Sequence, residues 1–290
     1  MELTAKNIIL FGFCDPISSW SHLIGAVVFL ILSYPLFKKA KGSPSRIVAL
    51  AIYTFSLVFL FSMSGVYHLL SYDGDARPVL QRLDHAAIWV LIAGTFTPIH
   101  VILFRGPWRW LILLIVWIIA ITGLTLQVIF FTSFPEWLVL SLFLGLGWIG
   151  ALTGYKFRKS FHGESLRLLA SGGIYYSIGA VLDFLKWPII IPLVMGAHEV
   201  FHFFVIAGAI AHWRFIYNWA DHPVANTISF QVKIFPNGSC VADAQSEHLK
   251  TEASNLDLLK EKIRILVREK YHESIEPKIH LKYSNEEYLD

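Results

Sequence analysis

Long apolar blocks separated by short polar stretches run through most of the chain. A helix needs about 20 apolar residues to cross a hydrocarbon core of roughly 30 Å. Segments of this kind cover residues 17–37, 47–70, 85–104, 108–131, 136–155, 166–185 and 189–215. The pattern therefore predicts an all-α membrane bundle of seven transmembrane helices, in which the seventh helix starts near Ile189.

A different pattern begins after Pro223. Apolar residues first alternate with polar ones as in a strand, and Asn237-Gly238 is a strong hairpin turn signal. Ser254 is the expected N-cap of a helix with one apolar face, and a last strand is expected around residues 279–283. We expect an N-terminal segment over 1–16, a transmembrane domain over 17–215 and a small C-terminal α+β soluble domain over 224–290. This last domain is expected to bind a protein partner or to mediate self-association.

Composition agrees with a membrane location. The chain is 55% hydrophobic and 16% charged, with a mean hydropathy of +0.56, which excludes an ordinary soluble domain. The net charge of +3 is too small to indicate nucleic-acid binding. Cys14 and Cys240 are expected on opposite sides of the membrane, so no disulfide framework is predicted. The first apolar segment has no small-residue cleavage site and is expected to remain as a helix.

Lysine and arginine residues set the expected orientation. They concentrate in the loops after the first, third and fifth segments and at the end of the seventh, while few lie on the other side. Because short cytoplasmic loops are enriched in Lys and Arg, we expect the N-terminus outside and the C-terminus in the cytoplasm of a bacterial cell.

Polar residues inside the apolar segments are the best candidates for a functional site, since each is costly in hydrocarbon. In seven antiparallel helices, they converge near the side of the membrane where the N-terminus lies. The converging residues are Asp15, His22, Ser64, His68, Asp84, Asp183, His198 and His202.

The pentapeptide "HEVFH" at residues 198–202 matches the zinc motif H-E-x-x-H. His198 and His202 project from one helical face, and His68 is the natural third ligand, which leaves a fourth position for water as in catalytic zinc sites. Asp84 is the best placed carboxylate to deprotonate that water. Glu199 points about 100° away from its neighbours on a helix. We therefore read the motif as H-x-x-x-H and not as that of a membrane protease.

Three blocks resemble the hemolysin III and PAQR (progestin and adipoQ receptor) superfamily. They are "SMSGVYH" ending at His68, "RLDHAAIWVLIAGTFTPI" at 82–99 and "HEVFHFFVIAGAIAHW" at 198–213. The resemblance implies zinc on His68, His198 and His202, with Asp84 and Ser64 around the metal-bound water. It also implies a more distant similarity to alkaline ceramidases, which hydrolyse a lipid amide.

The first block of the family departs from its usual E-x-x-N-x-x-x-H. Here "DPISSWSH" has Asp15 for the glutamate and Ser18 for the asparagine, while His22 matches. Asp183 stands where family members more often carry an aromatic residue, and it could pair with Lys186. Asp15, His22 and Asp183 are therefore candidates for a supporting role behind the ligands.

The expected function is zinc-dependent hydrolysis of an amide or ester bond in a membrane lipid. Asp84 and Ser64 would be the catalytic residues, with membrane lipids as partners and substrates. Two alternatives remain open at this point. One is a membrane-homeostasis sensor or receptor with a structural zinc, and the other is a pore-forming, hemolysin-like channel.

Overall fold

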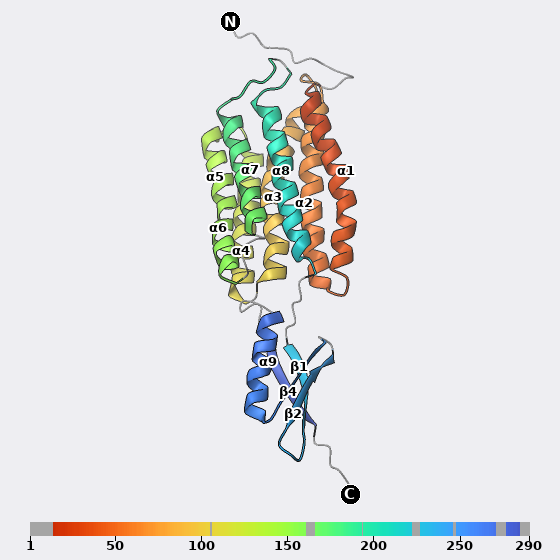
Figure 1. The fold of residues 1–290 in the computed structure, drawn as a ribbon. Helices are drawn as coiled ribbons and strands as arrows, with labels where there is room; N and C mark the ends of the chain where they lie inside the picture. Colours follow the sequence, from red (N-terminus) through yellow and green to blue (C-terminus); the bar gives the residue numbers. More distant parts are fainter. Residues whose placement is uncertain are drawn as a thin grey trace. The chain divides into compact units, whose positions relative to one another are not determined.

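A computed structural model describes residues 14–104, 106–160, 166–192, 194–221, 227–245, 248–270 and 277–284. The chain divides into two compact units, Met1–Asp221 and His222–Asp290. The first unit is a helical bundle and the second contains a small sheet with one helix (Figure 1). Most of the predicted N-terminal segment, residues 1–16, lies outside the described residues.

The bundle contains eight of the described helices. Three of them, α1, α2 and α4, begin with proline, whose missing N–H and fixed φ suit the first helical position. The helices are α1 (Pro16–Lys39), α2 (Pro44–Leu69), α3 (Ala76–Leu103), α4 (Pro107–Ile129), α5 (Glu136–Trp148), α6 (Gly150–Ser160), α7 (Leu166–Phe184) and α8 (Ala197–Trp219).

Six candidate membrane spans are found among the described residues. They are α1, α2, α3, α4, the combined segment Glu136–Arg158 and α8. Helix α7 has the length of a span, but Arg167, Asp183 and several glycine, serine and tyrosine residues lower its hydropathy. The predicted bundle of membrane helices is confirmed, whereas the predicted number of seven spans is not.

Several helix boundaries differ from those predicted. Helix α8 begins at Ala197 and not near Ile189, because the apolar residues just before Gly196 are not helical and Gly196 is the N-cap. His198 is therefore in the first turn. Helix α3 begins at Ala76, so Asp84 lies more than two turns into it. The fifth predicted span is interrupted between α5 and α6, next to Gly147 and Gly150.

Close packing brings α1, α2 and α8 together at the end of the bundle where α1 begins. The backbone N–H of Asp15 donates to the carbonyl of His68 over 3.1 Å, and Ser19 Oγ donates to the carbonyl of Gly65 over 2.7 Å. A side chain in place of Gly65 would lie 2.7 Å from Leu23, so only glycine permits this approach. Helix α8 packs against α7 on one side and α1 on the other (Figure 1).

Helices α7 and α8 also meet through glycines. A Cβ atom at Gly172 would lie 2.2 Å from the ring of His212, and one at Gly208 would lie 2.9 Å from the ring of Tyr176. The missing side chains let the two helices pack closely. This contact fixes α7, and with it Asp183, beside the first turn of α8.

The second unit is a four-stranded sheet with the order β3-β2-β1-β4. Its elements are β1 (Thr227–Ile234), β2 (Cys240–Ala244), β3 (Leu249–Ala253), α9 (Leu256–Lys270) and β4 (Lys278–Ser284). Strands β1 and β2 form the predicted hairpin, in which Gly238 has φ +83°, and β4 pairs parallel to β1. Buried side chains from β1, β2, β3 and α9 form one core.

Two details of this unit differ from the prediction. Strand β3 is additional, since its short and polar sequence gave little signal. The helix is capped by Asn255, whose Oδ1 accepts from the N–H of Leu258 over 2.8 Å, and not by Ser254. Cys14 and Cys240 are both free and buried.

Candidate metal centre

Three histidines meet where α2 ends and α8 begins. His68 is in the last turn of α2, and His198 and His202 are in the first two turns of α8. His198 Nε2 lies 3.0 Å from His68 Nε2 and 3.1 Å from His202 Nε2. One ligand atom from each residue lies within 4.8 Å of the others, so the three imidazoles could hold one metal ion.

Asp15 holds the far side of the His68 ring. Its Oδ2 lies 3.1 Å from His68 Nδ1 and 3.1 Å from the guanidinium of Arg77, and its Oδ1 accepts from Tyr72 over 2.5 Å. Arg77 also donates to the carbonyl oxygens of Tyr67 and Leu70. Asp15 and Arg77 are buried, and the network fixes the position of the carboxylate beside His68.

Asp183 does the same for His198. Its Oδ1 lies 3.2 Å from His198 Nδ1 and 3.9 Å from the ammonium of Lys186, the pairing that the sequence indicated. His22 stacks on His202, with ring centroids 3.8 Å apart and an interplanar angle of 27°. Each of the three residues predicted to have a supporting role therefore contacts one histidine of the cluster.

The tautomers that follow from these contacts favour a cation between the rings. An ionised carboxylate only accepts hydrogen bonds, so Nδ1 of His68 and of His198 donates, and in the neutral ring Nε2 carries the lone pair. These lone pairs face each other at 3.0 Å. Such an arrangement is repulsive unless a proton or a metal ion lies between them. The donor set therefore fits a metal.

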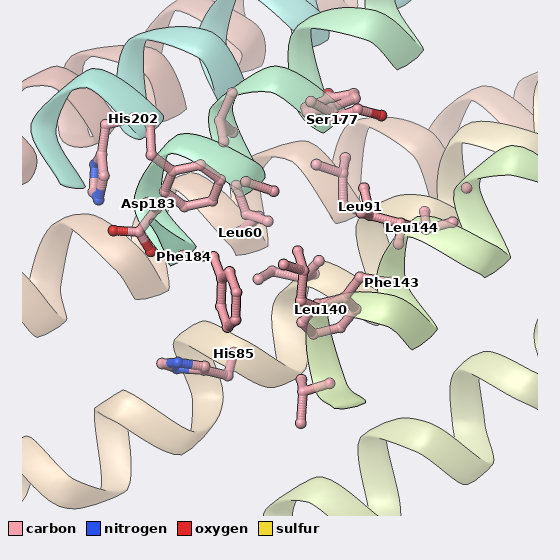
Figure 2. Close-up of a pocket in the computed structure, with 18 of the residues that line it drawn as sticks. Leu60, His85, Leu91, Leu140, Phe143, Leu144, Ser177, Asp183, Phe184 and His202 are labelled. Atoms are coloured by element: carbon pink, nitrogen blue, oxygen red, sulfur yellow. The ribbon is translucent and has the colours of Figure 1, made fainter. Parts of the chain in front are cut away.

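Asp84 and Ser64 line the same cavity as the three histidines. Ser64 is buried one turn before His68 on α2, and Asp84 lies on α3. The cavity has a volume of about 1410 Å³. Figure 2 shows His202 and Asp183 on one side of part of this cavity, with the apolar lining residues Leu91, Leu140, Phe143 and Leu144 on the other.

Glu199 has a structural place in this arrangement. Its Oε2 accepts from the N–H of Gly196 over 2.8 Å and caps α8, while its Oε1 accepts from Ser18 Oγ over 3.2 Å. The carboxylate thus ties the start of α8 to α1. This placement agrees with reading "HEVFH" as two histidines with a glutamate between them.

Tyr72 and Arg77 were not among the residues that the sequence singled out. Both lie in or just after the loop that follows α2, where no helical period indicates which side chains point inward. Arg77 contributed only to the charge asymmetry of the loops. The signal that identifies it is tertiary, because its guanidinium is buried against Asp15, Tyr67 and Tyr72.

The fold and the histidine cluster define an integral membrane helical bundle with a buried site that could bind a metal. A family model described as "Haemolysin-III related" matches residues 14–213. The chain belongs to this family, within the hemolysin III/PAQR superfamily. The match includes all eight residues of the predicted site and ends before the second unit.

Individual relatives agree with this assignment. "Hemolysin-3" of Bacillus cereus is 31% identical over 191 residues, 65% of this chain and 84% of the relative. "Hemolysin-3 homolog" of Bacillus subtilis (strain 168) is 34% identical over 190 residues, 65% of this chain and 83% of the relative. More distantly, the "Adiponectin receptor protein" of Drosophila melanogaster is 24% identical over 225 residues, 71% of this chain and 50% of the relative.

Proposed function

We propose that this protein is a zinc-dependent hydrolase that cleaves an amide or ester bond of a membrane lipid, as a ceramidase does. One observation carries the proposal. The three Nε2 atoms that could hold a metal, a carboxylate at Asp84 and a hydroxyl at Ser64 all line one large cavity whose remaining walls are mainly apolar.

Zinc is the metal that the donor set favours. Imidazole nitrogens suit Zn²⁺, and three protein ligands with an open fourth position are typical of its catalytic sites. When bound, zinc would polarise an acyl carbonyl and supply a water that is acidic enough to react near neutral pH. His68, His198 and His202 would hold it, and Asp15 and Asp183 would keep their rings in the ligating tautomer.

The residues around the histidines would carry the proton chemistry. Asp84 would accept a proton from the attacking water and return it to the leaving amine or alcohol. Ser64 would donate a hydrogen bond to the oxygen on which negative charge develops. The apolar walls would hold an acyl chain and exclude bulk water, and the substrate would enter sideways between helices, with its scissile bond at the histidines.

A membrane sensor or receptor is the second candidate. The similarity to a protein named as a receptor favours it, and the second unit, outside the matched range, would then dock a partner or a second copy. A pore is the third reading, after the relatives named hemolysins. We also propose a bacterial cytoplasmic membrane as the location, with the N-terminus outside. In this orientation, a reporter that works only in the cytoplasm should be active when it is fused after Asp290, and a reporter that works only outside the cytoplasm should be inactive.

The decisive experiment is a hydrolysis assay on the purified full chain. N-acyl and O-acyl lipids are incubated in mixed micelles, and released fatty acid is measured by mass spectrometry. Release by the wild type that disappears in His198→Ala/His202→Ala supports a hydrolase. Metal in the wild type without release from any lipid supports the sensor. Passage of dye through liposomes that is independent of both histidines supports a pore.

A further inference from the structure

The cavity extends well beyond the histidine cluster. Its lining includes Glu136 and Arg158, the first and last residues of one candidate membrane span. It also includes Leu166 and Phe184, the two ends of α7. At 1.5 Å per residue, the distance along a span from Glu136 to Arg158 is about 33 Å. The cavity therefore runs through most of the depth of the bundle and has two chemically different ends.

Charge is distributed unequally between these ends. Every carboxylate among the described lining residues belongs to the end with the histidines: Asp15, Asp84, Glu136, Asp183 and Glu199. At the opposite end, Arg158 is the charged residue of the described lining, beside Thr153, Tyr155 and Leu166. Lys156, two residues before it, is directed at the ring of Trp108, 5.6 Å from the centroid.

No acidic side chain forms an ion pair with Arg158 in the part of the chain that the structure describes. An exposed guanidinium that lines a mainly apolar cavity has the chemistry to bind an anion that carries an apolar chain. The loops on this side of the bundle are rich in Lys and Arg, and this positive potential would concentrate anionic lipids there.

We propose that Arg158 is the headgroup end of a lipid site separate from the histidine cluster. An anionic amphiphile binds with its carboxylate or phosphate on the guanidinium and its acyl chain in the cavity. Its orientation is opposite to that of the proposed substrate, whose polar end lies at the histidines. The site requires neither a metal nor hydrolysis.

Binding of matched charged and neutral ligands tests this site. Tritiated oleate is compared with tritiated oleyl alcohol, and dioleoyl phosphatidic acid with dioleoyl glycerol, on the purified full chain in a nonionic detergent. Wild type should prefer at least one anionic ligand over its neutral match by about tenfold or more, the strength of a charge-assisted hydrogen bond. A preference for oleate assigns a fatty acid, and one for phosphatidic acid assigns a phospholipid.

Three variants show where the preference arises. Arg158→Gln should abolish it and Arg158→Lys should retain part of it. Arg214→Gln should leave it unchanged, because Arg214 is exposed near the same side of the bundle but does not line the cavity. Equal binding of charged and neutral ligands by the wild type, or an unchanged preference in Arg158→Gln, would overturn the proposal.

The histidine variant separates this site from the metal centre. His198→Ala/His202→Ala should keep the preference for the anion, since Arg158 lies at the other end of the cavity. Loss of the preference in that variant would show that the carboxylate or phosphate binds at the metal, and the Arg158 site would be rejected. Failure of the hydrolysis assay alone would leave the Arg158 site intact.

Discussion

Two buried histidine environments in the same bundle differ in how their nitrogens are satisfied. His100, on α3, is 0% exposed, with Nδ1 3.0 Å from the carbonyl oxygen of Trp108 and Nε2 2.9 Å from Thr153 Oγ1. A neutral imidazole satisfies both contacts, because Nδ1 donates to the carbonyl and Nε2 accepts from the hydroxyl. The partners of His100 complete its hydrogen bonding within the protein.

The cluster of His68, His198 and His202 is not complete in this way. Carboxylates hold Nδ1 of His68 and of His198, and the Nε2 atoms are directed at one another. The difference shows that burial alone does not indicate a metal site. What distinguishes the cluster is that one ring nitrogen of each histidine lies within 4.8 Å of the others, while carboxylates hold the opposite side of two rings.

Replacement of His198 and His202 should have the largest effect, which is the loss of the bound metal. Wild-type protein should contain about one zinc per chain, and His198→Ala/His202→Ala should contain essentially none. Elemental analysis of the purified protein, with all transition metals quantified, measures this. His100→Gln is the matched control and should keep the metal. Equal metal content in wild type and the double variant would mean that the cluster is only a polar contact between helices.

Asp84→Asn should separate catalysis from metal binding. The amide keeps the shape of the side chain but cannot accept the proton, so lipid hydrolysis should fall about 100- to 10,000-fold. Zinc content and melting temperature should stay near those of the wild type. Undiminished hydrolysis would remove Asp84 as the base. Loss of zinc from this variant would instead make Asp84 part of the metal's coordination.

Substitution of the two carboxylates that contact His68 and His198 should have intermediate effects on the affinity for zinc. Asp15→Asn and Asp183→Asn each weaken the hold on one ligand ring, so the affinity for zinc should fall about 10- to 100-fold. Competition with a chelator of known affinity measures this fall. Melting curves of the metal-free proteins separate it from a general loss of stability, which we expect mainly for Asp15 because its loss leaves Arg77 buried without its carboxylate. Unchanged affinity in both variants would contradict the role of these carboxylates.

Glu199→Gln should have the smallest effect. Glutamine retains an oxygen to accept from Gly196 and can still contact Ser18, so zinc content and hydrolysis should change by less than about threefold. Kinetics at saturating lipid measure this change. A loss comparable to that of Asp84→Asn would restore Glu199 as the catalytic base and the protease-like reading of "HEVFH".

Local sequence predicted most of the helices and named the residues of the candidate site. Apolar length predicted the membrane helices because the hydrocarbon core admits few alternatives to a helix. The cost of polar groups in hydrocarbon singled out the eight site residues, and spacing by four placed His198 and His202 on one face.

The tertiary structure decided the partners of these residues. A pattern along one helix does not show which carboxylate approaches which ring, so only the packing of α1 and α7 beside the histidines paired Asp15 with His68 and Asp183 with His198. Arg77 became part of the site for the same reason. Hydropathy also merged the loop before Gly196 with α8, since apolar side chains suit a loop or a helix equally well at the edge of a membrane.

The charge asymmetry of the cavity likewise depends on tertiary structure. The sequence does not show that Arg158 and Asp183 line opposite ends of one cavity, because they lie on different helices, α6 and α7, with a loop between them. The sequence by itself determined that the polar side chains of the apolar segments face the inside of a helical bundle, because their transfer into hydrocarbon costs free energy. Which of them meet was decided by helix packing, where glycines such as Gly65, Gly172 and Gly208 allow close approach.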